Sequence, residues 1–316
     1  MEKRVEFLGR VEDLRGLIED LGKQGFAVRN VGADASRTYV YLDPSETKDP
    51  GSVVASWVNR PAPSSIKRER TPESTRVIVM TLCNRPNYVR RVFKALSECV
   101  GISDYIIIPM VEPVNKEVIE LAHNIDFAEG RPVVNPSQYG PHRNTYEAFK
   151  RGFEIADFVI LVQEDDELAP DALSFFEYCR QKYRDAEDVF SVNAYALVKE
   201  AWRPPPEKYH RLCRRRHFMS FTAATWRSRW EEPGGMKDNW DFKQGWDIMI
   251  DGRFRKGRWE IHPCLPRVQN IGAEGGLYTP NAEWHRRTVH NEFWSGDPRI
   301  RDEMIAAAKA AAPWYE

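Results

Sequence analysis

The chain has 316 residues, 42% of them hydrophobic, which is long enough and apolar enough to bury a packed core. Its 46 basic and 47 acidic residues leave a net charge of -1, which argues against a general attraction to nucleic acid. The five cysteines include no C-x-x-C pair, which argues against a disulfide framework or a zinc cluster. No run approaches the roughly 20 apolar residues of a membrane span, so we predict a cytoplasmic chain with no membrane partner.

Residues 1–60 are predicted to form a small α/β accessory domain. Apolar residues at helical spacing predict a helix over 11–21, and short apolar runs predict strands at 26–28 and 38–42. The next segment is rich in proline and charge, so residues 61–74 are predicted as a linker. Residues 75–316 are then the main domain.

Within the main domain, short apolar runs alternate with helical patterns. Such alternation predicts an α/β fold with a doubly wound, mostly parallel sheet and helices on both faces. Ligands of such sheets bind at the carboxyl ends of the strands. The expected strands are 76–82, 105–110, 132–134 and 158–162, and the expected helices are 88–100, 117–123, 145–155 and 172–183.

From about residue 190 the alternation stops, and Trp, Arg and His residues appear among Pro and Gly turns. This half is predicted to be largely irregular and to face the substrate, because irregular segments often carry function. A terminal helix is expected over 300–312.

Three adjacent carboxylates, Glu164, Asp165 and Asp166, directly follow the strand expected at 158–162. Their mutual repulsion is tolerable in a solvated turn, and such a turn is one interpretation. The other is a divalent cation among them, since Mg²⁺ and Mn²⁺ prefer oxygen ligands. Such a cation would bridge a diphosphate and neutralise it as it departs.

The segment QEDDELAPDALSFFEY, residues 163–178, resembles the acidic segment of glycosyltransferase family 13, the N-acetylglucosaminyltransferase I type. The resemblance implies a GT-A fold, a UDP-sugar donor and Mn²⁺ or Mg²⁺. It also implies that Asp166 binds the metal, while Glu164 and Asp165 contact the donor.

Other segments resemble the same family in matching order. Arg85 follows the first strand near the nucleotide, and Glu112 follows the second, where an acidic residue meets the uridine. A His-containing segment opens the helix before the acidic strand, and a late segment contains P-R-V-Q-N-I-G at 266–272. The resemblance therefore adds His142, Arg143 and Arg267 to the predicted donor-binding residues.

A carboxylate is needed to take the proton of an acceptor hydroxyl during inverting transfer. Asp247 lies in a G-W-D stretch that resembles the one carrying the catalytic base in the family, although Ile248 replaces its second aspartate. Asp241 and Asp238 are the fallback candidates, and an ordinary surface aspartate is the plain alternative. His285 is the candidate for a late histidine ligand of the metal, the alternative being a structural histidine.

The function predicted is a metal-dependent inverting glycosyltransferase that moves GlcNAc or glucose from a UDP-sugar to a hydroxyl of an acceptor glycan. One alternative is a phage-type enzyme that glycosylates hydroxymethylated pyrimidines in DNA, in the host cytoplasm. Two basic clusters, around 211–217 and 253–258, are compatible with that alternative, although such runs are usually solvated surface. A further alternative is a non-catalytic binding module or a nucleotidyltransferase.

Overall fold

The computed structural model describes residues 4–7, 28–33, 38–42, 71–309 and 314–316. The chain divides into two compact units, Met1–Glu69 and Arg70–Glu316. In the first unit, β1 (Arg4–Phe7), β3 (Thr38–Leu42) and β2 (Val28–Ala33) form an antiparallel sheet in that order. The strand predicted at 38–42 is therefore confirmed, whereas the helix predicted at 11–21 lies outside the described residues.

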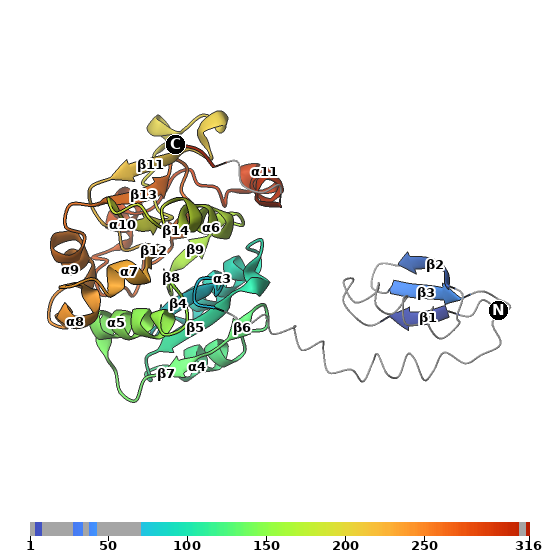
Figure 1. Cartoon of the computed structure of the whole chain (residues 1–316), viewed down its shortest axis with the longest axis horizontal. Coiled ribbons are helices and arrows are strands. Elements are labelled where there is room, and N and C mark those ends of the chain that lie inside the picture. Colours follow the sequence, from blue (N-terminus) through green and yellow to red (C-terminus); the bar gives the residue numbers. More distant parts are fainter. Residues whose placement is uncertain (1–3, 8–27, 34–37, 43–70, 310–313) are drawn as a thin grey trace. The chain divides into compact units, whose positions relative to one another are not determined.

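A nine-stranded sheet organises the second unit (Figure 1). Its strand order is β11-β13-β10-β12-β8-β4-β5-β6, with β7 also pairing with β5. The pairs among β8, β4, β5, β6 and β7 are parallel, whereas β12 runs antiparallel to both of its neighbours. The strands are β4 (Val77–Leu82), β5 (Ile106–Val111), β6 (Glu129–Gly130), β7 (Val133–Val134), β8 (Phe158–Gln163), β10 (Val189–Asn193), β11 (Leu212–Arg215), β12 (Ala223–Trp226) and β13 (Trp259–Pro263).

The chain order reverses between β4 and β8. From β4 the chain crosses to β5 and then to β6 and β7, and it returns to place β8 on the other side of β4. In a doubly wound sheet, the carboxyl ends on either side of such a reversal form the ligand-binding crevice. The segments after Leu82 and Gln163 are therefore the places to look for a site.

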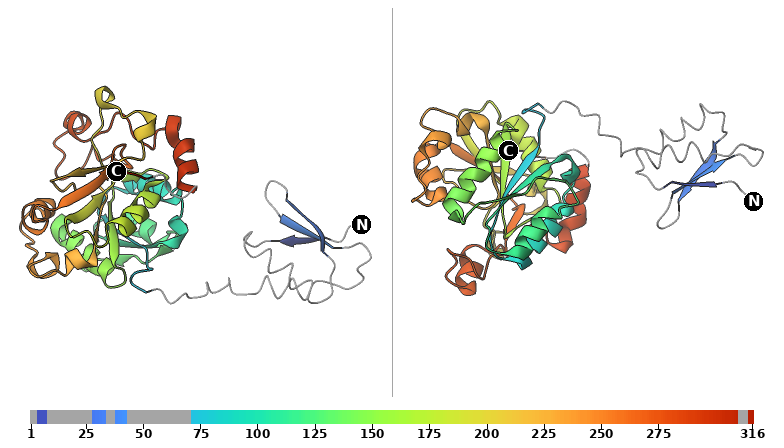
Figure 2. Two further views of the ribbon diagram at one scale, coloured as in Figure 1. Left: turned by 45° about the horizontal axis from the view of Figure 1, so that its top comes forward. Right: turned by 90° about the horizontal axis from the view of Figure 1, so that it is seen from below.

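Helices cover both faces of the sheet, and alternate residues of β4 divide between two cores. Ile78, Met80 and Leu82 pack with α3 (Pro86–Ser97), α4 (Lys116–His123) and α6 (Ala172–Lys182). Val77 and Val79 pack on the opposite face with α5 (Gly140–Phe153), α7 (Arg227–Trp230), α8 (Met236–Asn239) and α9 (Trp246–Met249). Figure 2 shows the sheet between these two helical layers. The predicted α/β fold is confirmed, with a central, mostly parallel sheet between helices.

The helix boundaries follow local chemistry. Asn115 is the N-cap residue of α4, and its side chain accepts hydrogen bonds from the backbone N–H groups of Glu117 and Val118 in the first turn. The helix α5 begins at Gly140, five residues before the predicted start. Gly140 has φ = 74°, which suits glycine, and Pro141 fits the first turn of a helix because it needs no N–H partner.

The prediction that the chain becomes irregular after residue 190 is wrong in part. The strands β10, β12, β13 and β11 extend the sheet beyond β8. A separate ribbon pairs β9 (Asp166–Leu168) with β14 (Val268–Asn270), and short helices follow. The helix predicted at 300–312 is α11 (Pro298–Lys309), preceded by α10 (Ala282–Thr288). No helix in the described segments combines the length and apolar content that crossing a bilayer requires.

Candidate donor-binding site

Arg85 joins two members of the acidic triplet at the point where the chain order reverses. Its Nε donates to Glu164 Oε1 and its Nη2 to Asp165 Oδ2, both at 2.7 Å. The backbone N–H of Cys83 donates to Glu164 Oε2 at 2.7 Å, so both oxygens of Glu164 are occupied. Burial alone would lower the pKa of Arg85, but Asp165 and Glu164 outweigh it and raise that pKa. The guanidinium therefore offsets much of the repulsion between the two carboxylates.

A glycine-rich segment that follows β14 lies against this cluster. A Cβ on Gly272 would stand 2.0 Å from Asp165 Oδ2 and 3.2 Å from Arg85 Nη1, so only glycine fits there. The N–H of Ile271 donates to the Asp165 carbonyl, and the N–H of Glu274 donates to Tyr88 Oη. The backbone of this segment thus approaches the carboxylates more closely than a side chain would permit.

Asp166 is fully buried and faces away from Arg85. Its Oδ2 accepts hydrogen bonds from the N–H and hydroxyl of Thr222 at 2.9 and 3.0 Å, and its Oδ1 accepts from Asn270 Nδ2 at 3.0 Å. Burial raises the pKa of Asp166 to about 7, with the charge of Asp165 adding to that effect and the Asn270 and Thr222 hydrogen bonds opposing it. Thr222 has φ = 41°, an unfavourable value for a β-branched residue that its two bonds to Asp166 help to hold.

The predicted metal ligands do not form a preassembled site. Asn270 separates Asp166 from His285, because its Oδ1 accepts from His285 Nε2 at 2.9 Å while its Nδ2 bonds Asp166. Both Asp166 oxygens are already occupied, and within the described residues no three His, Cys, Asp or Glu side chains gather in a geometry for a metal. Burial lowers the pKa of His285, with His290 adding to the effect. Among the described residues, the protein side chains alone therefore assemble no site of three such ligands for the predicted Mn²⁺ or Mg²⁺.

Glu112 stands at the carboxyl end of β5 and is 2% exposed. Its Oε2 accepts from the Tyr139 N–H at 2.8 Å and from Asn135 Nδ2 at 3.3 Å. Asn135 is held in turn by Asn144 Oδ1 at 2.9 Å. The other carboxylate oxygen of Glu112, Oε1, is buried and has no hydrogen-bond partner in the described part of the chain. Glu112 is thus a fixed carboxylate with one acceptor atom open.

His142 and Arg143 lie in the first turn of α5. The His142 ring stacks on Tyr278 with ring centres 6.4 Å apart, and its Nε2 lies 3.3 Å from Tyr278 Oη. Arg143 is exposed, and its guanidinium lies 3.9 Å from the centre of the Tyr139 ring. The Nδ1 atom of His142 is buried and lacks a partner among the described residues.

Three predicted donor-binding residues therefore share one property. Arg85 Nη1, Glu112 Oε1 and His142 Nδ1 are buried polar atoms without a hydrogen-bond partner in the described segments. Each such atom costs about 1–3 kcal/mol, unless a ligand or water supplies the missing bond. They belong to the segments that follow β4, β5 and β7, which are neighbouring parallel strands. Together they offer donors and an acceptor at one edge of the sheet.

Arg267 does not join this group, contrary to the prediction. It is 0% exposed, and its Nε donates to Asp171 Oδ2 at 2.8 Å. Its remaining nitrogens donate to the carbonyls of Leu265 and Tyr209. A guanidinium enclosed by such partners holds the fold together and is not free to bind a donor.

Asp247, the predicted base, lies in the first turn of α9 and is partly exposed. The segment that leads to α9 runs beside the start of α5, because Trp240 Nε1 donates to the His142 carbonyl at 3.2 Å. Within the described residues no hydrogen bond or ion pair joins Asp247 to the acidic triplet. The fallback candidates Asp238 and Asp241 are both exposed on the same segment.

Internal contacts occupy much of the two basic clusters. Arg215 pairs with buried Glu260 at 2.7 Å, Arg255 pairs with Asp251 at 2.8 Å, and Arg258 pairs with Glu232 at 2.6 Å. Arg216 lies 4.0 Å from the centre of the Trp259 ring. These clusters therefore do not present a continuous free surface for the DNA of the alternative interpretation.

Most tryptophans of the second half belong to the core. Trp226, Trp230, Trp240 and Trp246 are buried, whereas Trp202 is 70% exposed. These four buried rings are therefore structural.

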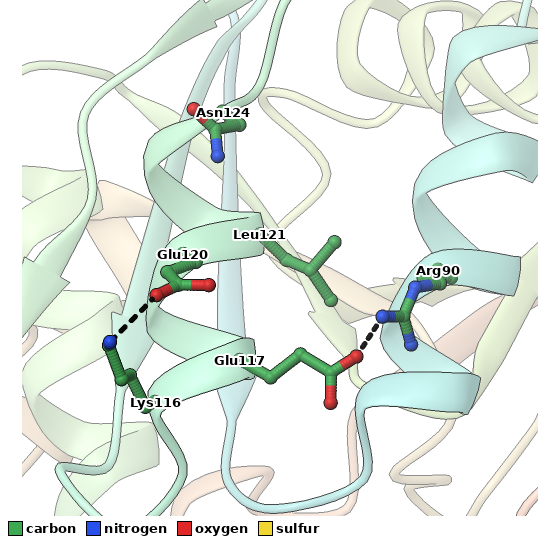
Figure 3. A pocket seen from close by; sticks show the side chains of 6 residues that line it. All are labelled: Arg90, Lys116, Glu117, Glu120, Leu121 and Asn124. Atoms are coloured by element: carbon green, nitrogen blue, oxygen red, sulfur yellow. Dashed lines mark hydrogen bonds and ion pairs between the residues drawn. The ribbon is translucent and has the colours of Figure 1, made fainter.

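A surface pocket between α3 and α4 contains none of the predicted site residues. Its charged side chains already pair with one another: Arg90 with Glu117, and Lys116 with Glu120 (Figure 3). We assign it no role.

Several residues that build the site were missing from the predicted site residues. Asn135 and Asn144 orient Glu112, and the only sequence signal for them was their place after a strand and at the start of a helix. Thr222 anchors Asp166 across a separation of 56 residues, which no local pattern reveals. Gly272 lies within the late motif at 266–272 that the sequence analysis singled out. That only glycine fits there depends on the nearby Asp165 side chain and is not visible in the sequence.

No family model and no curated protein matches the sequence. Among solved structures, the chain is similar to TarS from S. aureus, determined with UDP-GlcNAc, at 11% identity and a TM-score of 0.43. That similarity covers 60% of this chain and 58% of TarS, so the chain spans less than two thirds of TarS. It is also similar to mannosyltransferase PcManGT from Pyrobaculum calidifontis, determined with GDP-Man and Mn²⁺, at 14% identity and a TM-score of 0.45. That similarity covers 77% of this chain and 75% of PcManGT. Similarities this low carry no function to this chain.

Proposed function

We propose that this chain is a glycosyltransferase that takes its sugar from a UDP-sugar. The observation that carries the proposal is that three buried polar atoms, Arg85 Nη1, Glu112 Oε1 and His142 Nδ1, lack a hydrogen-bond partner in the described segments that follow β4, β5 and β7. A nucleotide diphosphate offers the complementary groups, because its base has N–H donors and its diphosphate has anionic oxygens. The order of the family-13-like segments along the chain supports the same donor.

The open oxygen of Glu112 favours uracil over guanine. The imide of uracil presents one N–H, which matches the single free Oε1. The Watson–Crick edge of guanine presents two adjacent donors and would pair best with both oxygens of a carboxylate, but Oε2 already accepts from Tyr139 and Asn135. We therefore expect UDP to bind more tightly than GDP.

Arg85 is the residue that we assign to the diphosphate. Glu164 and Asp165 fix its Nε and Nη2, which leaves Nη1 to donate to a phosphate oxygen. Glu164 acts as a positioning residue, since both of its oxygens are occupied. Asp165 retains an oxygen that receives no hydrogen bond from the described residues and would face the sugar. The Mn²⁺ or Mg²⁺ cofactor stays a prediction of the sequence.

Transfer with inversion requires a carboxylate that takes the proton of the acceptor hydroxyl as the sugar–phosphate bond breaks. Asp247 stays the proposed base, on the segment that flanks α5. We expect Asp247→Asn to bind UDP normally and to lose transfer at least about 100-fold, the usual size of a general-base contribution. Transfer at the wild-type rate would remove Asp247 from this role.

Calorimetric titration of UDP and GDP, with and without Mn²⁺, tests the donor proposal. Glu112→Gln keeps the shape of the side chain and should weaken UDP binding about tenfold, the loss of one hydrogen bond to a charged group. Glu120→Gln on the exposed face of α4 is the matched control and should leave it unchanged. No UDP affinity under either condition would refute the proposal. UDP affinity without transfer to any hydroxyl acceptor would favour the binding-module alternative.

A further inference from the structure

Two cysteines lie as neighbours on the edge pair of strands, away from the proposed donor site. Cys213 lies on β11 opposite His262 of β13. Cys264 follows β13, and its N–H donates to the Arg211 carbonyl at 2.7 Å. Residues directly opposite in an antiparallel pair share a face, as do residues two apart along a strand. Cys213 and Cys264 are therefore diagonal neighbours on one face, and both are partly exposed.

The thiols of this pair interact with each other and with basic side chains. The hydrogen bond from Cys213 is the main cause that lowers the pKa of Cys264 to about 6, against the effect of burial and with help from Arg211, Lys208 and Arg267. The same bond, with burial, raises the pKa of Cys213. His262, Arg215 and Glu260 share that face, and burial lowers the pKa of His262 to about 3, with Arg215 adding to the effect, so His262 stays neutral there.

The other three cysteines, all within the described residues, lack this chemistry. Burial raises the pKa of Cys83 to about 11. Cys99 and Cys179 are buried, and burial raises the pKa of both thiols. The thiolate is the nucleophile in cysteine chemistry, so Cys264 stands apart from them.

We propose that Cys264 and Cys213 form a thiol–disulfide exchange site that reacts with a small disulfide such as oxidised glutathione. Cys264 is the attacking residue, since it is partly exposed and pairs through its backbone N–H with the basic residue Arg211 on the neighbouring chain segment. Cys213 is the resolving residue, since it lies beside Cys264 on the neighbouring strand. The site is a place of reversible modification and takes no part in the proposed sugar transfer.

The exchange balances in two steps. The Cys264 thiolate attacks one sulfur of oxidised glutathione, so a mixed disulfide forms and one glutathione leaves as its thiolate. Cys213 loses its proton to solvent, its sulfur attacks Cys264 Sγ, and the second glutathione leaves as a thiolate. The two cysteines are oxidised to a disulfide, and oxidised glutathione is reduced to two thiols. Reduced glutathione in excess reverses both steps.

A disulfide here would tie β11 to the segment that leads into β14. Cys264 lies three residues before Arg267 and six before Asn270, which holds Asp166. The cross-link therefore restrains a chain segment that ends at Asn270, the residue that holds the Asp166 carboxylate.

Mass spectrometry of the full-length native protein treated with oxidised glutathione tests the proposal. In the wild type we expect a Cys213–Cys264 disulfide, found by peptide mapping without reduction after the free thiols are blocked. In Cys213→Ser, which lacks the resolving thiol, glutathione should stay attached at Cys264. Cys264→Ser should gain no adduct at Cys213, and Cys83→Ser is the matched control that should behave as the wild type. An adduct on Cys83 before Cys264, or unaltered oxidation in Cys264→Ser, would overturn the proposal.

Alkylation of the unmodified protein gives a second readout that needs no variant. At pH 7, iodoacetamide should modify Cys264 at least about tenfold faster than Cys83, because the larger thiolate fraction outweighs the lower nucleophilicity of a low-pKa thiolate. The rate at Cys264 should reach half of its maximum near pH 6. Equal rates at the two positions would contradict the assignment of Cys264 as the attacking residue.

Discussion

Gly272 shows how closely a single position controls the proposed donor site. Its backbone occupies the space beside Asp165 and Arg85 that any side chain would require. Glycine carries no Cβ, so the chain approaches the two charged groups without moving them. The geometry of the Arg85–Asp165 pair therefore depends on the absence of a Cβ atom at Gly272.

Gly272→Ala should therefore weaken UDP binding by about tenfold or more. The added methyl would stand 2.0 Å from Asp165 Oδ2, so Asp165 must move and its bond to Arg85 must lengthen. Calorimetry measures the affinity, and circular dichroism checks that the fold persists. Ala273→Ser, a small change at the adjacent half-buried position, should bind UDP as the wild type does. Wild-type affinity in Gly272→Ala would mean that the pair does not contact the donor.

Two partly buried histidines should make the second unit less stable in acid. Burial lowers the pKa of His262 to about 3 and that of His210 to about 4, from an ordinary value of 6.5. Between these values and 6.5 the unfolded chain binds more protons than the folded one, so the free energy of unfolding falls as pH falls. Each histidine contributes a slope of up to about 1.4 kcal/mol per pH unit in that window.

Urea unfolding between pH 4 and pH 7 measures this slope. His262→Asn should reduce the slope of the unfolding free energy with pH by the contribution of one titrating histidine. His123→Asn, on the exposed surface of α4, should leave that slope unchanged. An identical slope in His262→Asn and the wild type would show that His262 titrates in the folded state as it does in the unfolded chain.

At the scale of elements, α5 is positioned by a second glycine. A Cβ on Gly152 would lie 2.7 to 2.9 Å from methyl groups of Val159 and Val79, which belong to the central strands β8 and β4. The helix therefore rests directly on the sheet. The first turn of α5, which carries His142, is held at the carboxyl edge by the same packing.

Gly152→Ala should destabilise the protein by about 1–3 kcal/mol, the usual cost of adding a methyl to a filled core. Gly252→Ala is the matched control, because a Cβ there meets no atom within 4 Å. It should be neutral or slightly stabilising. Denaturant unfolding compares the two, and equal midpoints would show that α5 shifts without cost.

The sequence predicted the elements of the parallel half well and those of the antiparallel half poorly. β4, β5 and β8 are continuous apolar runs because both of their faces are covered, and such runs are visible locally. β12 and β14 have four and three residues, and their pairing with β8 and β9 depends on residues far away in the chain. Short strands held by distant partners leave little local pattern.

The same contrast applies to the site. Arg85, Glu112 and the acidic triplet come at or shortly after strand ends, and the family resemblance, which places donor-binding residues there, marked them as candidates. The resemblance assigned Asp165 and Asp166 different roles, but their contacts could not be predicted, because these depend on Arg85, Thr222 and Asn270 folding around them.

On the scale of the whole molecule, the second unit contains every residue of the proposed donor site. All the open polar atoms and the acidic triplet lie within Arg70–Glu316. We therefore predict that a fragment of residues 70–316 unfolds cooperatively and binds UDP within about twofold of the full chain. Calorimetry of both proteins measures this, and a loss of affinity in the fragment would give the first unit a part in donor binding.

Because β9 pairs with β14, the positions of the carboxylates in the acidic triplet depend on the register of that pair. Neighbouring side chains of a strand point to opposite faces, so Asp166 is enclosed while Asp165, one position earlier, meets Arg85. Loss of Glu167 would make Asp166 and Leu168 adjacent, so that their side chains, which now share a face, would point to opposite faces and one of the two would leave its place. The chain would still contain both aspartates. The Asp165 carboxylate that pairs with Arg85 and the Asp166 carboxylate that accepts from Asn270 would no longer both lie in their present positions. The two aspartates are alike in chemistry but not interchangeable in place.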